Sequence, residues 1–99
     1  MAEQKIDISI IVACYNEMQV IKQSLPRIEE IMRVSRYSYE IILYDDGSTD
    51  GTRELGPLLA AQSSNIIWKQ HENNLGRGQT VRDGLALARG RISGFIDMD

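Results

Sequence analysis

Apolar positions along the chain follow two kinds of spacing. Four short runs are rich in β-branched residues and bounded by polar turns, which is typical of strands buried in a parallel sheet. Between these runs, apolar residues recur at steps of three and four, as on one face of a helix. The predicted strands span 6–13, 40–44, 65–69 and 92–96, and the predicted helices span 17–36, a segment ending near 62, and 79–88.

This order, βαβαβαβ, predicts an α/β fold: a Rossmann-like parallel sheet with helices on both faces, in three layers α/β/α. Ligands of such folds bind beyond the carboxyl ends of the strands. Two residues are expected to interrupt or end a helix. Pro26 is expected to kink or break the first helix, and Gly90 is expected to close the third helix as its C′ residue.

Composition indicates one small globular domain. The chain has 99 residues, 25% charged and 42% hydrophobic, with a net charge of −3 that argues against a nucleic-acid partner. It shows no signal peptide and no apolar run of membrane-spanning length. Its single cysteine cannot form an internal disulfide, which favours a reducing compartment, and we expect a cytoplasmic location. Charge is uneven, since residues 1–50 carry 5 basic and 9 acidic side chains.

Polar clusters follow three of the predicted strands. Asp97 and Asp99 end the chain after the fourth strand, and alternate carboxylates there can bind one hard cation such as Mg²⁺ or Mn²⁺. The alternative is a solvated polar loop. After the second strand come Asp45 and Asp46, and we expect Asp46 to face a ligand, accepting from a ribose hydroxyl or a base N–H. The same run supplies turn and cap chemistry, with residues 48–50 as helix caps.

Tyr15, Asn16 and Glu17 follow the first strand. The cluster suits stacking or hydrogen bonding to a base, and equally an N-cap by Asn16. Glycines flank Arg77 before the third helix, where Arg77 or the backbone could approach phosphate, although a flexible loop opening the helix is the simpler interpretation. 

Three further side chains are interpreted as structural. His71 has no partner motif and is expected to be an ordinary loop histidine. Cys14 lacks a nearby base and is expected to be a packing residue, and Trp68 is expected in the core.

Taken together, these motifs resemble the family 2 glycosyltransferases, which have the GT-A fold. The resemblance is carried in order by residues 13–17, the run D-D-G-S-T-D-G-T at 45–52, and the segments 73–76, 88–90 and 97–99. Residues 75–78 and the D-x-D form are also similar to the polyprenyl-phosphate sugar synthases of the dolichol-phosphate mannose or glucose type.

The resemblance implies glycosyl transfer from a UDP- or GDP-sugar, usually with inversion and with a divalent metal, Mg²⁺ or Mn²⁺. It implies that Tyr15, with Glu17 in the same motif, contacts the base or ribose, and that Asp46 contacts the nucleoside. It further implies that Asp97 and Asp99 hold the metal and the diphosphate. The acceptor is not specified, and a polyprenyl phosphate is one candidate.

Family members are longer, so residues 1–99 are expected to be the truncated N-terminal, donor-binding part of a glycosyltransferase domain, inactive alone, with the general base elsewhere. Membrane association of the parent is left open. Exposed sheet edges also suggest pairing of two copies. Two alternatives stand beside this hypothesis: a non-catalytic nucleotide-binding or assembly module, and a nucleotidyltransferase-like α/β enzyme that uses nucleoside triphosphates.

Overall fold

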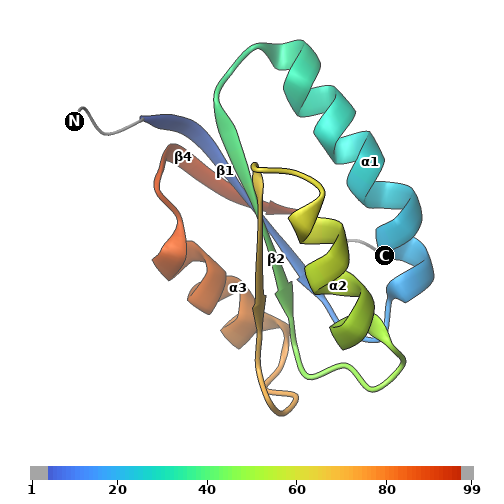
Figure 1. The fold of residues 1–99 in the computed structure, drawn as a ribbon. Coiled ribbons are helices and arrows are strands. Elements are labelled where there is room, and N and C mark those ends of the chain that lie inside the picture. Colours follow the sequence, from blue (N-terminus) through green and yellow to red (C-terminus); the bar gives the residue numbers. More distant parts are fainter. Residues whose placement is uncertain (1–4, 97–99) are drawn as a thin grey trace.

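The computed structural model of the chain describes residues 5–96. Strands and helices alternate through this range, as the apolar pattern predicts (Figure 1). In chain order the elements are β1 (Ile6–Cys14), α1 (Met18–Ser35), β2 (Tyr39–Asp45), α2 (Thr52–Ala61), β3 (Ile66–Gln70), α3 (Arg77–Leu87) and β4 (Gly90–Ile96).

The sheet has four strands in the order β3-β2-β1-β4, and all neighbours are parallel. Helices α1 and α2 lie on one face and α3 lies on the other (Figure 1). The predicted α/β fold with three layers is therefore confirmed. Because β1 and β2 occupy the middle of the sheet, the loops that follow them lie in the middle of its carboxyl edge.

The two central strands are apolar on both faces because both faces are covered. Ile11 and Ile42 are opposite each other in the register and fully buried, and the Ile11 side chain packs against Gly84 of α3. The opposite face carries the larger core, which α1 and α2 close. Its buried members are Ile10, Val12, Cys14, Ile21, Leu25, Ile28, Met32, Ile41, Leu43, Ala60 and Ile66.

Trp68 on β3 is half-buried and packs against this core, as predicted. Its indole occupies the space above Gly56 of α2, where a Cβ atom would lie 2.0 Å from the ring. The glycine inside α2 is thus explained by the close approach of the tryptophan rather than by helix propensity.

The structure corrects two predictions about residues expected to interrupt or end a helix. Pro26 does not break α1, which continues from Met18 to Ser35, and a kink there stays a prediction. Pro26 is exposed, so the carbonyl group that it leaves without a partner lies on the solvent side. Gly90 does not close α3 but begins β4, where a Cβ atom would lie 2.6 Å from the backbone nitrogen of Ser9. A close approach of two strands, not a helix end, requires that glycine.

Strand β4 forms one outer edge of the sheet and is exposed over much of its length. Ile92 and Phe95 are 69% and 59% exposed. Pairing of two copies through a sheet edge stays a prediction, and β4 offers the apolar edge for it. Among residues 5–96, no helix has the length and apolar character needed to cross a membrane.

Candidate functional site

The carboxyl ends of three strands meet at one edge of the sheet. Cys14 of β1 pairs with Asp45 of β2, and Asp45 pairs with Gln70 of β3. The loops that follow these residues therefore begin side by side, although they are far apart in the sequence. This is the edge at which parallel α/β folds bind ligands.

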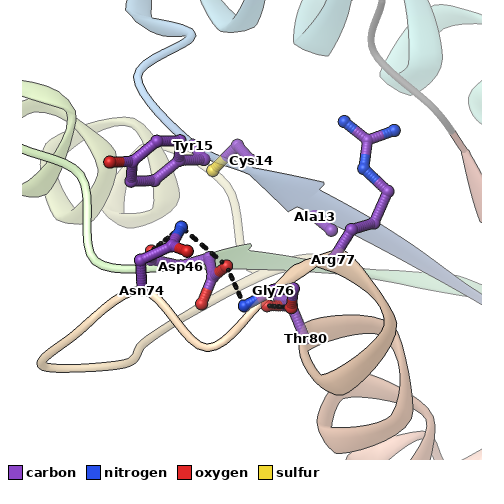
Figure 2. A pocket seen from close by; sticks show the side chains of 8 residues that line it. All are labelled: Ala13, Cys14, Tyr15, Asp46, Asn74, Gly76, Arg77 and Thr80. Carbon is purple, nitrogen blue, oxygen red and sulfur yellow. Dashed lines mark hydrogen bonds between the residues drawn. The ribbon is translucent and has the colours of Figure 1, made fainter.

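A cavity of about 280 Å³ opens at this edge, next to the N-terminus of α3 (Figure 2). Its walls come from the end of β1, the loop after β2, the loop between β3 and α3, and the start of α3. The lining residues are Ala13, Cys14, Tyr15, Asp46, Asn74, Gly76, Arg77 and Thr80. Two residues predicted to contact a ligand, Tyr15 and Asp46, are thus brought to the same cavity.

Asp46 is the most densely bonded residue of the cavity. Its Oδ1 accepts a hydrogen bond from the Leu75 backbone N–H at 2.9 Å. Its Oδ2 accepts from the Gly76 backbone N–H at 2.9 Å and from Asn74 Nδ2 at 3.1 Å. Burial raises the pKa of Asp46, but the hydrogen bonds, first that of Leu75 and then that of His71, hold it below its usual range. Asp46 is therefore an ionised carboxylate that fixes the loop before α3.

His71 also belongs to this network, which the sequence prediction of an ordinary loop histidine missed. It is 9% exposed, and its Nδ1 lies 2.8 Å from Asp46 Oδ1. Its Nε2 lies 2.7 Å from Oδ2 of Asp83 on α3. A signal was available in the sequence, because His71 directly follows β3 and the carboxyl edge also includes the end of that strand.

The pKa of His71 is raised. Burial lowers it, but the hydrogen bonds from the ring to Asp46 and Asp83 and the charges of both carboxylates outweigh that effect. The pKa of Asp83 is lowered by its hydrogen bonds with His71 and Gln79. The directions agree, as expected for one imidazolium between two carboxylates.

These shifts predict how stability depends on pH. His71 stabilises the fold fully below its ordinary pKa of 6.5, and this contribution is lost as pH rises through the raised pKa of the folded state. Asp46 stabilises above its ordinary pKa of 3.8, and that contribution is lost as pH falls through the lowered pKa. The free energy of unfolding, measured by urea titration, should therefore be greatest between pH 3.8 and pH 6.5, the two ordinary pKa values, and should decline above pH 6.5. In His71→Gln the decline at high pH should disappear, and its persistence would show that another group causes it.

Asp45 has a different function from its neighbour. It is fully buried, and its Oδ2 accepts from the backbone N–H groups of Gly47 and Ser48 at 3.1 and 2.9 Å, while the Ser48 hydroxyl donates to Oδ1. Its partners lie in the turn after β2, whereas those of Asp46 lie in the loop before α3. Asp45 thus closes the turn after β2, and Asp46 faces the cavity.

The loops after β1 and β2 are joined by side chains, and of the two alternatives for Asn16 the helix N-cap is not observed. Asn16 Oδ1 accepts from the Thr49 backbone N–H at 2.7 Å, and its own N–H donates to the Ser48 hydroxyl at 2.8 Å. Among the predicted caps, Asp50 accepts from the Thr52 N–H at the start of α2 at 3.1 Å. The Ser48 hydroxyl instead donates to Asp45 and stabilises the turn after β2.

Tyr15 and Glu17 flank this connection. Tyr15 is 43% exposed and its side chain lies beside the cavity (Figure 2). Glu17 Oε1 accepts from the Tyr15 backbone N–H at 3.1 Å, and Glu17 is not among the residues that line the cavity. Glu17 therefore contacts the backbone of Tyr15, which lines the cavity, rather than the cavity itself.

Cys14 directly precedes Tyr15 and is 2% exposed. Burial, followed by the negative charge of Asp45, raises the pKa of its thiol. The thiol stays protonated, which agrees with the predicted packing role.

The predicted metal ligands Asp97 and Asp99 lie outside the described residues. Within residues 5–96, no group of three or more histidine, cysteine or acidic side chains is arranged to hold a metal ion. Asp46 is the carboxylate among the cavity-lining residues, and its oxygens already accept from the loop before α3. The described part of the cavity therefore does not form a metal centre by itself.

A parallel α/β sheet with a cavity at its carboxyl edge defines a ligand-binding domain of the doubly wound class. The family described as "Glycosyl transferase family 2" matches residues 9–99, so the chain belongs to the family 2 glycosyltransferases, as its motifs suggest. Its parallel α/β architecture matches the GT-A fold of solved glycosyltransferases.

Individual relatives agree with this assignment. A dolichyl-phosphate beta-glucosyltransferase of Dictyostelium discoideum is 34% identical over 99 residues, covering 93% of this chain and 30% of the relative. A mannosyltransferase of Pyrobaculum calidifontis, solved with GDP-Man and Mn²⁺, superposes with a TM-score of 0.80 at 25% identity, covering 97% of this chain and 28% of that one. TarS of S. aureus, residues 1–349 with UDP-GlcNAc, gives 0.79 at 26% identity, covering 95% and 27%. The chain thus spans less than a third of each.

Proposed function

We propose that this chain is the donor-binding part of an inverting, metal-assisted glycosyltransferase that uses a UDP- or GDP-sugar. The observation that carries the proposal is the cavity at the carboxyl edge, which brings Tyr15 and Asp46 together beside Arg77. Solved relatives hold GDP-Man with Mn²⁺ and UDP-GlcNAc, which supports this class of ligand. We propose that the 99-residue chain is inactive without the rest of the glycosyltransferase.

Each side chain of the cavity has a proposed task. The half-exposed ring of Tyr15 offers a flat apolar face to a nucleobase. Asp46 contacts the nucleoside and keeps the loop before α3 in place. The guanidinium of Arg77 supplies positive charge and a planar set of donors suited to phosphate oxygens. Glu17 supports the position of Tyr15.

The sugar–phosphate bond breaks with negative charge collecting on the nucleoside diphosphate. Asp97 and Asp99 are the proposed ligands of a Mg²⁺ or Mn²⁺ ion, which when bound would act as a Lewis acid toward the diphosphate. They directly follow β4, whose Ile96 pairs with Val12 near the end of β1. The D-x-D pair is thus proposed to complete the cavity from the side of β4.

The acceptor is proposed to be a polyprenyl phosphate, as the name of the dolichyl-phosphate relative suggests. A phosphate oxygen is ionised at neutral pH and therefore needs less help from a general base than a hydroxyl group does. No residue of this chain is proposed as that base.

Calorimetry with UDP and GDP, each with and without Mn²⁺, tests the proposal. We expect metal-dependent binding that is weakened at least about tenfold by Asp46→Asn, because a charged acceptor in a shielded site is lost. Asp99→Ala should remove the dependence on Mn²⁺. Glu54→Ala changes an exposed carboxylate on α2 and should leave binding unchanged.

Circular dichroism of each variant separates loss of binding from loss of fold. Binding that is undiminished in both Asp46→Asn and Asp99→Ala would contradict the proposed site. Transfer or hydrolysis of a nucleotide-sugar by the 99-residue chain would contradict its proposed inactivity.

A further inference from the structure

The His71 side chain joins three parts of the molecule that are distant in the sequence. Its Nδ1 lies 2.8 Å from Asp46 after β2, and its Nε2 lies 2.7 Å from Asp83 on α3. The Asp46 side chain is 5% exposed and the Asp83 side chain is 35% exposed, so the contact with Asp46 is shielded from water. The ring of Tyr44 contacts the imidazole at a centroid distance of 4.8 Å, with the two ring planes tilted by 50°.

This geometry fixes the charge of the ring. An ionised carboxylate only accepts hydrogen bonds, and a neutral histidine donates from only one of its two nitrogens. Both ring nitrogens of His71 lie at hydrogen-bond distance from carboxylate oxygens. Both contacts are favourable only for the imidazolium, which donates from both nitrogens. Loss of one proton would direct a lone pair at a carboxylate.

The same carboxylate that His71 contacts also holds the wall of the cavity. Asp46 accepts from the backbone N–H groups of Leu75 and Gly76 and from the Asn74 amide. Asn74 and Gly76 line the cavity, and Figure 2 shows both directed at Asp46. The position of Asp46 and the shape of the 71–76 loop are therefore set together.

We propose that His71 is a positioning residue of the donor site: as an imidazolium it clamps Asp46 to Asp83, and nucleotide binding weakens when the clamp loses its proton. The role of His71 in the shape of the loop follows from the contacts above. Its effect on nucleotide rests on the proposed function of the cavity.

The charges around His71 come from each neighbouring element. Asp46 faces the ring from the end of β2, and Tyr44 of the same strand contributes a neutral phenol ring. From α3, Asp83 faces the ring, with Gln79 donating to that carboxylate at 2.8 Å and Arg82 moderating its charge. Two carboxylates contact the ring directly, one at each nitrogen, so the surroundings favour the protonated ring.

Nuclear magnetic resonance tests the clamp without any ligand. The chain has one histidine, so its ring signals are unambiguous. We expect His71 to titrate above pH 6.5, and the backbone amide signals of Leu75 and Gly76 to shift with the same midpoint. In Asp83→Asn the midpoint should fall. Glu72→Gln, a matched control that neutralises the exposed carboxylate next to His71 in the chain, should move it much less.

Calorimetry with UDP and GDP in the presence of Mn²⁺, from pH 5.5 to 8.5, tests the link to binding. The terminal phosphate of each nucleotide titrates in the same pH range. The comparison is therefore between the nucleotide affinity of the unaltered chain and that of His71→Gln at each pH. We expect the unaltered chain to bind about tenfold more tightly at low pH and this advantage to vanish above the His71 midpoint. In Asp83→Asn, the affinity advantage that His71 provides should disappear at a lower pH.

The outcomes are distinguishable. Amide signals of Leu75 and Gly76 that ignore the His71 titration would overturn the clamp, whatever the nucleotides do. Identical pH profiles for the unaltered chain and His71→Gln, with binding present, would overturn its effect on the site. If neither nucleotide binds at any pH, the proposed function fails, and the amide signals alone decide the role of His71.

Discussion

Replacing Gly47 with alanine is expected to lower the free energy of unfolding by about 3 kcal/mol, which is a large fraction of the stability of a small domain. Gly47 has a φ of +79°, in the left-handed region, where a side chain costs roughly 1 kcal/mol. An added Cβ would also lie 2.6 Å from the Asn73 carbonyl carbon and 2.7 Å from the Asn74 nitrogen. Backbone atoms cannot rotate away as a flexible side chain can, so the two loops must separate.

Urea unfolding of Gly47→Ala measures this effect, and Gly51→Ala is the matched control. Gly51 has a similar φ of +96°, but an added Cβ would meet only the Met18 sulfur at 3.6 Å. Gly51→Ala should therefore introduce the backbone strain without a clash between the added Cβ and the other loop. Its free energy of unfolding should fall by about 1 kcal/mol. Equal losses in the two variants would show that the contact between the loops does not contribute.

Gly47→Ala should also change the shape of the cavity. Asn73 and Asn74 belong to the loop whose amide groups contact Asp46, and Asn74 itself lines the cavity. Pushing this loop away would lengthen the hydrogen bonds that hold Asp46. Gly47 thus connects the stability of the turn after β2 to the geometry of the proposed donor site.

Replacing Glu40 with alanine is the second change with a large expected effect, again a loss of about 3 kcal/mol. Glu40 is 2% exposed on β2. It accepts from the Ser9 hydroxyl at 2.6 Å, from the Arg89 backbone N–H at 2.7 Å and from the Arg89 guanidinium at 3.0 Å. Removing the carboxylate leaves several donors without an acceptor, and that cost exceeds the loss of the contacts themselves.

Burial raises the pKa of Glu40, but hydrogen bonds from Ser9 and Arg89 hold it below the usual range, so the carboxylate is ionised at neutral pH. Glu40→Gln keeps the shape but not the charge and should lose less stability than Glu40→Ala. Arg33→Ala removes an exposed i,i+3 pair with Glu30 and should cost less than about 0.5 kcal/mol in the same urea titration. A Glu40→Ala loss no greater than that of Arg33→Ala would contradict the buried role.

The two carboxylates on and after β2 hold opposite ends of α3. Asp46 accepts from the backbone of Leu75 and Gly76 just before the helix. Glu40 accepts from the backbone of Arg89 just after it. Both lie on the face of the sheet that α3 covers. Because α3 has few buried apolar residues of its own, these polar attachments at its ends fix where it lies on the sheet.

Much of the fold could be predicted from the sequence. The apolar runs identified all the described strands and helices, with most bounds within about two residues. The central strands are apolar throughout because both of their faces are covered. The alternation of strands and helices determined the three layers and the edge where ligands bind. The motifs at that edge, with Tyr15 and Asp46 among them, were enough to indicate family 2 of the glycosyltransferases.

Only the tertiary structure decided what each polar residue at that edge does. His71 and Asp46 are 25 residues apart, and Glu40 and Arg89 are 49 apart, so no local pattern pairs them. Asn16 and Gly90 looked like helix punctuation, but one joins two loops and the other allows two strands to approach. Local spacing reports which face of an element is buried, because burial follows the period of the helix or strand. Which donor meets which acceptor depends on the distances between packed elements, and these exist only once the sheet and its helices have assembled.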